Sequence, residues 1–184
     1  MKILVVGLGG IGQRHLRNIL TTLGDSGQVQ AVDPRSNIPV LTDKLQVEAG
    51  ATLEGNYGLK IHPDLESGLM CHPDAVFVCN PTSMHITTAL QAVNAGCHVF
   101  IEKPLSHNMA EVDDLHTLVG KQGLVAVVGY QMRFHPCLIR LHELIASKRI
   151  GNILSARAEI GEYLPGWHTY EDYRQMYASR RDLG

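Results

Sequence analysis

The chain has 184 residues, of which 45% are hydrophobic, and a formal net charge of −2 at pH 7. No apolar run approaches the roughly 20 residues that span a bilayer, and no block of like charges favours nucleic acid or a membrane surface. The length predicts one full domain and part of a second.

The N-terminus has one lysine before Ile3–Val6 and does not resemble a secretory signal peptide, so we expect a cytoplasmic protein. Four cysteines form no C-x-x-C pair and are expected to be reduced, mostly buried thiols. Ten histidines are scattered without the spacing of zinc ligands on a helix, so no metal site is predicted.

The first predicted elements are a strand over Lys2–Gly7 and a helix over Gly10–Leu23, joined by a G-x-G-x-x-G turn. We expect Gly7 to make the turn, Gly9 to leave room for a pyrophosphate, and Gly12 to let the helix pack on the strand. The helix N-terminus offers N–H groups and a partial positive charge to phosphates. The alternative is a strand–helix unit whose glycines only permit close packing.

A second apolar strand, Gln28–Val32, leads into Asp33. Asp33 follows Gly12 by about 20 residues, the distance at which a carboxylate meets the adenosine ribose. A carboxylate accepts the 2′-hydroxyl of NAD and repels the 2′-phosphate of NADP, whereas Arg35 favours that phosphate. The sequence therefore predicts NAD, with NADP as the alternative.

The rest of the first domain alternates helices and strands. We predict helices over 40–49, 64–70, 83–94 and 108–119, and strands over 59–62, 75–79, 97–101 and 124–129. Either Thr82 or Ser83 is expected to cap the third of these helices. This alternation predicts an α/β fold, a doubly wound parallel sheet with helices on both faces.

Ligands bind at the carboxyl ends of the strands in such sheets. Four segments of interest directly follow predicted strands: Gly7–Gly12, Asp33, Asn80–His85 and Glu102–Pro104. We therefore expect them to share one edge of one sheet.

The pattern changes after Gly129. An amphipathic helix is predicted over His135–Lys148, and Ile153–Tyr163 alternates in hydrophobicity as a strand of an antiparallel sheet does. We therefore predict a first domain over 1–123 and the incomplete beginning of a second over 124–184. An exposed strand at Ile153–Tyr163 would also invite pairing between chains.

These residues resemble the Gfo/Idh/MocA oxidoreductases, the relatives of glucose-fructose oxidoreductase and inositol 2-dehydrogenase. The resemblance is carried by Gly7–Gly12, Asn80–His85, Ala95–Leu105 and Gly129–Pro136. It implies a Rossmann domain followed by an α/β domain with a mostly antiparallel sheet. It also implies hydride transfer between NAD(P) and a sugar, nucleotide sugar or polyol, and we expect the full-length parent to be a homo-oligomer.

The resemblance also implies roles for individual residues. Lys103 would reach the substrate oxygen, where a lysine donates a hydrogen bond to developing negative charge or exchanges the proton. The alternatives are that Lys103 pairs with a surface carboxylate and that His85 only bonds to backbone. The Lys103–Pro104 peptide bond is a candidate for the cis form. The residues expected to bind the cofactor are Gly7, Gly9, Gly10, Ile11, Gly12, Asp33, Arg35, Asn80, Pro81, Thr82, His85, Glu102, Lys103 and Arg133.

In the family, a run of three glycines and then an Asp and a His on a helix complete the active site; the sequence stops at Gly184, where that run would begin. We therefore expect these residues to bind cofactor and to turn over poorly by themselves. One alternative is a non-catalytic NAD-responsive regulatory or scaffold module. Another is a different Rossmann reductase, such as a homoserine dehydrogenase relative, although Glu102-Lys103-Pro104 argues against it.

Overall fold

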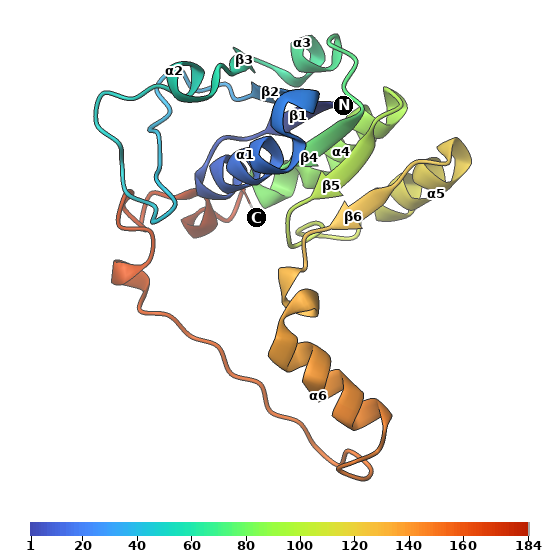
Figure 1. Cartoon of the computed structure of the whole chain (residues 1–184). Coiled ribbons are helices and arrows are strands. Elements are labelled where there is room, and N and C mark those ends of the chain that lie inside the picture. The colour runs from blue at the N-terminus through green and yellow to red at the C-terminus, as the bar shows by residue number, and fades with distance from the viewer. Residues whose placement is uncertain (184) are drawn as a thin grey trace. The chain divides into compact units, whose positions relative to one another are not determined.

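The computed structural model describes residues 1–183, which form two compact units (Figure 1). The first, called here the sheet unit, contains Met1–Gly129 together with residues 168–183. The second unit is Tyr130–Trp167. The chain therefore leaves the sheet unit and returns to it.

The sheet unit is built on six parallel strands in the order β3-β2-β1-β4-β5-β6. Val6 lies opposite both Val32 and Val78, and Val78 lies opposite Ile101. The carboxyl ends of the four inner strands are therefore level, and the segments that follow them emerge at one edge. The strands are β1 (Lys2–Val6), β2 (Gln28–Val32), β3 (Lys60–His62), β4 (Ala75–Val78), β5 (His98–Ile101) and β6 (Ala126–Val128).

Helices cover both faces of this sheet, as the sequence predicts for a doubly wound fold. One apolar cluster joins β1 and β2 to α1 and α2, and the other joins the opposite face of the sheet to α3, α4 and α5. No helix within residues 1–183 is long and apolar enough to cross a membrane. The helices are α1 (Gly10–Leu23), α2 (Leu53–Tyr57), α3 (Leu65–Leu69), α4 (His85–Asn94) and α5 (Val112–Gln122).

The helix predicted over 40–49 is wrong. That stretch instead makes an isolated antiparallel bridge between Leu41 and Val47. The reason is the buried side chain of Gln13, which accepts a hydrogen bond from the Leu41 N–H (2.8 Å) and donates one to the Pro39 carbonyl (2.8 Å). These backbone groups are satisfied by a side chain from α1, so no helix is needed to satisfy them.

The sheet also continues past the expected domain boundary at residue 123, because β6 (Ala126–Val128) pairs with β5. In the second unit, α6 (Pro136–Ala146) forms within the predicted helix. The predicted strand Ile153–Tyr163 does not form, and Leu154 and Ile160 are 95% and 94% exposed. A strand needs a neighbour for its backbone hydrogen bonds, and none pairs with it in residues 1–183. The predicted antiparallel sheet is therefore not seen in this part of the chain.

Candidate functional site

The glycine turn between β1 and α1 has little steric freedom at its two ends. Gly7 has a φ of +93°, and a Cβ there would lie 2.7 Å from the Cys79 carbonyl oxygen. A Cβ on Gly12 would lie 1.9 Å from the carbonyl oxygen of Gly7, so only glycine lets α1 approach β1 this closely. A Cβ on Gly9, in contrast, would meet nothing within 4 Å.

The open space beside Gly9 lies at a helix N-terminus. The Gln13 N–H donates to the Gly9 carbonyl oxygen (3.0 Å), so the amides of residues 10–12 precede the first hydrogen bond of α1. Such amides and the positive end of the helix dipole attract anions. Bare backbone, open space and amides that lie outside the hydrogen bonds of α1 therefore fit a pyrophosphate.

Asp33 follows β2 and is tied to the same turn. Its Oδ2 accepts from the Leu8 N–H (2.8 Å) and from Nη2 of Arg35 (2.7 Å), and its Oδ1 accepts from Nε (2.9 Å) and the backbone N–H (3.0 Å) of Arg35. Burial raises the pKa of Asp33, but these bonds outweigh burial and hold the pKa below its usual range. Asp33 is therefore an ionised carboxylate fixed beside the glycine turn.

Glu102 follows β5 and is also a buried carboxylate. Its Oε1 accepts a hydrogen bond from Nε2 of His15 in α1 (2.7 Å), and its Oε2 accepts from the Lys103 N–H (3.0 Å). Burial raises the pKa of Glu102, yet the His15 and Lys103 bonds bring it below its usual range. The His15 ring packs against Phe77 and Phe100, with centroids 5.6 and 4.9 Å away, and these two phenylalanine rings stack on each other. A carboxylate is thus held rigidly beside Lys103.

Lys103 has an exposed side chain and a backbone fixed by Glu102. The Lys103–Pro104 peptide bond is cis, which confirms the prediction from the family resemblance. The exposed side chain of Lys103 therefore extends from an anchored turn that follows β5.

His85 is buried and bonds to backbone through both ring nitrogens. Nδ1 lies 2.9 Å from the Pro104 carbonyl oxygen and Nε2 lies 2.9 Å from that of Asn80. These contacts agree with the alternative from the sequence analysis, in which His85 bonds to backbone. His85 thereby links the segments that follow β4 and β5 and positions both Asn80 and the Lys103–Pro104 turn.

The segment after β4 contributes one unusual polar atom. The Asn80 amide donates to the Thr88 hydroxyl (2.8 Å), while its Oδ1 is buried without a hydrogen-bond partner in residues 1–183. Thr82 is buried in the 3-10 turn Thr82–Met84, which Pro81 precedes. A buried acceptor without a partner is uncommon and is compatible with a ligand donor, such as an amide, arriving at this edge.

The structure brings together the predicted residues of four strand ends, in the segments Gly7–Gly12, Asp33–Arg35, Asn80–His85 and Glu102–Lys103. Arg133 belongs to the second unit, in the turn Gln131–Phe134, and its role stays a prediction. Within residues 1–183, no group of three or more His, Cys, Asp or Glu side chains is arranged to hold a metal ion.

The sequence analysis did not identify His15 or Gln13. His15 and Glu102 are 87 residues apart, and no spacing rule connects them. The only local signal for Gln13 and His15 is that polar residues interrupt the first turns of a helix that packs on the sheet.

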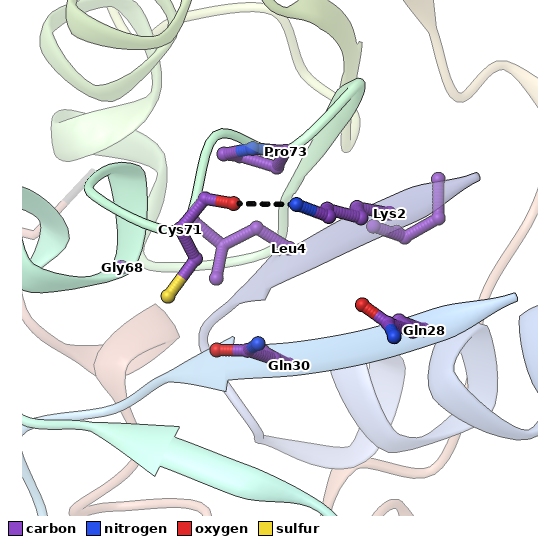
Figure 2. Close-up of a pocket in the computed structure, with 8 residues that line it drawn as sticks. Lys2, Leu4, Gln28, Gln30, Gly68, Cys71 and Pro73 are labelled. Carbon is purple, nitrogen blue, oxygen red and sulfur yellow. Dashed lines mark hydrogen bonds between the residues drawn. The ribbon is translucent and has the colours of Figure 1, made fainter.

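A small hollow lies at the opposite ends of the strands (Figure 2). Nζ of Lys2 donates to the Cys71 carbonyl oxygen (3.4 Å) inside it. Its lining includes Lys2, Gln28, Gln30, Gly68, Cys71 and Pro73. Lys2 and Gln28 begin β1 and β2, whereas the glycine turn follows the end of β1. The hollow is therefore separate from the candidate site.

Comparison with known proteins finds a family model, described as an oxidoreductase family with an NAD-binding Rossmann fold, that matches residues 1–130. A 4-carboxy-2-hydroxymuconate-6-semialdehyde dehydrogenase from Sphingobium is 30% identical over an alignment that covers 80% of this chain and 44% of the length of that enzyme. A myo-inositol 2-dehydrogenase from Thermotoga maritima is 32% identical over 82% and 42%.

Among solved structures, a UDP-N-acetylglucosamine 3-dehydrogenase from Acidithiobacillus ferrooxidans matches with a TM-score of 0.62 and 26% identity, over 78% of this chain and 42% of that one. The chain spans less than half the length of these relatives. The family model nevertheless covers most of the present sequence, including all four strand ends of the site. The chain belongs to the Gfo/Idh/MocA oxidoreductase family, and residues 1–130 match its NAD-binding Rossmann fold.

Proposed function

We propose that this chain is the cofactor-binding part of an NAD-dependent dehydrogenase that acts on a sugar, nucleotide sugar or polyol. The observation that carries the proposal is the convergence of a glycine turn, an ionised carboxylate and an anchored lysine at the carboxyl ends of one parallel sheet. Ligands of doubly wound sheets lie at that edge.

At the adenosine end, Asp33 would accept hydrogen bonds from the ribose hydroxyls. An ionised carboxylate attracts hydroxyl donors and repels a 2′-phosphate, which favours NAD over NADP. Arg35 already donates to both oxygens of Asp33, so a bound ribose shares the carboxylate with it or displaces its guanidinium. Gly9, Gly10 and Ile11 would hold the pyrophosphate next to Asp33.

At the nicotinamide end, bound NAD would accept a hydride from the carbon of a substrate alcohol. The hydroxyl proton of the alcohol would leave to a base as the hydride departs. Lys103 would either exchange that proton or donate a hydrogen bond to the substrate oxygen as negative charge develops there. Glu102 keeps its charge and holds the backbone of Lys103, and His85 holds the turn through the Pro104 carbonyl. The protein's contribution is thus the fixed position of one cation relative to the cofactor.

The substrate class is drawn from the relatives. Their names include a myo-inositol 2-dehydrogenase and a UDP-N-acetylglucosamine 3-dehydrogenase, and a semialdehyde dehydrogenase also matches. A polyol and a nucleotide sugar both carry a secondary alcohol that can give up a hydride. Because the chain covers less than half of each relative, the activity of the whole protein and its assembly as a homo-oligomer are parts of this proposal.

A pair of glycine substitutions tests the site without requiring turnover. A Cβ on either Gly9 or Gly120 meets nothing within 4 Å, so Gly9→Leu and Gly120→Leu should both fold and melt close to the unaltered chain. Calorimetric titration with NAD should give similar affinities for the unaltered chain and Gly120→Leu. The affinity of Gly9→Leu should be at least roughly tenfold weaker, because its side chain fills the space of the phosphates. Equal NAD affinities in the two variants would contradict the proposal.

A further inference from the structure

Residues 168–183, called here the strap, return to the sheet unit after the second unit. Figure 1 draws them in red, beside the start of α1. The strap is anchored by Met176, which is only 6% exposed, and its backbone turns on itself through the Met176 N–H, which donates to the Asp172 carbonyl oxygen (3.2 Å). It is therefore a folded part of the sheet unit.

The strap meets the glycine turn through Tyr170. The Tyr170 hydroxyl oxygen lies 2.7 Å, and its ring carbon Cζ 3.5 Å, from the point where a Cβ on Gly10 would be. Gly10 is the first residue of α1. A phenol hydroxyl thus sits against the helix N-terminus, and only the missing side chain of Gly10 allows this approach.

The strap also reaches the other three strand ends. Glu171 attracts the guanidinium of Arg35, which follows β2. The Leu183 carbonyl oxygen accepts a hydrogen bond from the Ser83 N–H (3.0 Å), after β4. Burial raises the pKa of Tyr177, and the charge of nearby Glu102, after β5, raises it further. One segment therefore crosses the whole edge assigned to the dinucleotide.

The chemistry of Tyr170 suits a phosphate. Burial, the charge of Glu171 and a hydrogen bond to the Glu171 side chain all raise the pKa of the Tyr170 phenol well above its ordinary value. The hydroxyl therefore stays protonated at neutral pH. Its one proton goes to Glu171, and a bound pyrophosphate would take over that hydrogen bond. Stacking of Tyr170 on the His168 ring, with centroids 5.4 Å apart, helps to fix the direction of the phenol.

We propose that the strap closes over the bound dinucleotide, with the Tyr170 hydroxyl donating a hydrogen bond to the pyrophosphate. This inference rests on the proposed NAD site and adds a fifth segment to it, one that comes from beyond the second unit. It assigns Tyr170 as a cofactor-binding residue and Gly10 as the position that makes room for it.

The first test is affinity. Tyr170→Phe keeps the ring and removes the donor, so the Kd for NAD in calorimetry should rise roughly tenfold or more, as expected for a lost hydrogen bond to a charged group. Tyr173→Phe is the matched control, because the packing of its ring against the Arg174 guanidinium (4.6 Å) does not need the hydroxyl. An unchanged Kd in Tyr170→Phe, with equal melting temperatures, would overturn the assignment of Tyr170.

The second test is protection from trypsin. Arg174 and Arg180 are exposed on the strap, and Arg149 is exposed in the second unit. Saturating NAD should slow cleavage after Arg174 and Arg180 at least roughly threefold and leave cleavage after Arg149 unchanged. Faster or unchanged cleavage of the strap in NAD would overturn closure, because it would mean that the nucleotide displaces the strap or ignores it.

A third variant tests, in the absence of NAD, whether the strap rests on Gly10. Gly10→Ala places a methyl group 2.7 Å from the Tyr170 hydroxyl, so the strap should lift and its cleavage after Arg174 should accelerate in the absence of NAD. Unchanged cleavage would contradict the contact between Tyr170 and Gly10. The outcomes separate the two proposals. If the unaltered, folded chain does not bind NAD, the proposed function is overturned. If it binds NAD, but NAD does not change cleavage of the strap and Tyr170→Phe does not change the affinity, only the proposed closure of the strap is overturned.

Discussion

The Nε2 atom of His15, in the first helix, lies 2.7 Å from the Oε1 atom of Glu102, at the end of the fifth strand. This hydrogen bond joins the helix that begins at the glycine turn to the residue that holds Lys103. It therefore connects the proposed phosphate end of the site with its proposed catalytic end.

Replacing His15 with leucine should destabilise the protein and change its response to pH. At about pH 7, loss of the bond leaves the buried carboxylate of Glu102 with one partner fewer, at a cost of about 1–3 kcal/mol in the free energy of unfolding. Urea unfolding measures this cost. His116→Leu, on the exposed face of α5, is the control and should change the free energy little.

The sign of the pH effect follows from the direction of the shift. The pKa of Glu102 is lowered in the folded chain, so its contribution to stability is present above the unfolded pKa of 4.5 and is lost as the pH falls through the folded value. The difference in the free energy of unfolding between the unaltered chain and His15→Leu should therefore be fully present above pH 4.5. It should shrink as the pH falls further, through the lowered pKa of folded Glu102. A difference that widens on acidification would refute this account of Glu102.

Gln13 should be among the costliest polar residues to replace. Its side chain is fully buried, donates to the Leu8 (3.0 Å) and Pro39 (2.8 Å) carbonyls, and accepts from the Leu41 N–H. Gln13→Leu leaves these backbone groups without partners, which should cost about 2–5 kcal/mol. Gln91→Leu on the exposed surface of α4 provides the comparison by urea unfolding. Equal stabilities of the two variants would contradict the role assigned to Gln13.

Arg35 should control how well NADP is tolerated. Its guanidinium neutralises Asp33 and is the cation closest in sequence to the proposed ribose site. Arg35→Ala should therefore weaken NADP binding roughly tenfold and change NAD binding less than about threefold, because NAD needs only Asp33. Calorimetric titration with both nucleotides measures this. Equal losses for both nucleotides would instead assign Arg35 to their shared pyrophosphate or adenine.

Local sequence signals were sufficient for most of the sheet. The central strands β1, β4 and β5 are short, mostly apolar runs bounded by glycine or a polar residue, and parallel strands buried on both faces have this composition. The glycine turn is equally local, because the steric demands on Gly7 and Gly12 arise within a few residues of β1. The sequence therefore predicted the strand ends, and with them the edge at which the site lies.

The errors come from partners that lie far away in the sequence. The alternating pattern of Ile153–Tyr163 is compatible with a strand, but a strand also requires a neighbour, and the described residues offer none. Residues around Leu41 have helical periodicity, yet a single buried amide from Gln13 satisfies their backbone. The bond between His15 and Glu102 and the approach of Tyr170 to Gly10 were invisible for the same reason.

The most direct test of the cofactor site is calorimetric titration of NAD into the unaltered chain and into Asp33→Asn, with a thermal melt of each. The substitution preserves the shape of a side chain that is fixed by Leu8 and Arg35, but removes its charge. We predict that the folded unaltered chain binds NAD and that Asp33→Asn binds it roughly tenfold more weakly, since a ribose hydroxyl bonds better to a carboxylate than to an amide. A folded chain that does not bind NAD, or that binds it equally well after the substitution, would contradict the account.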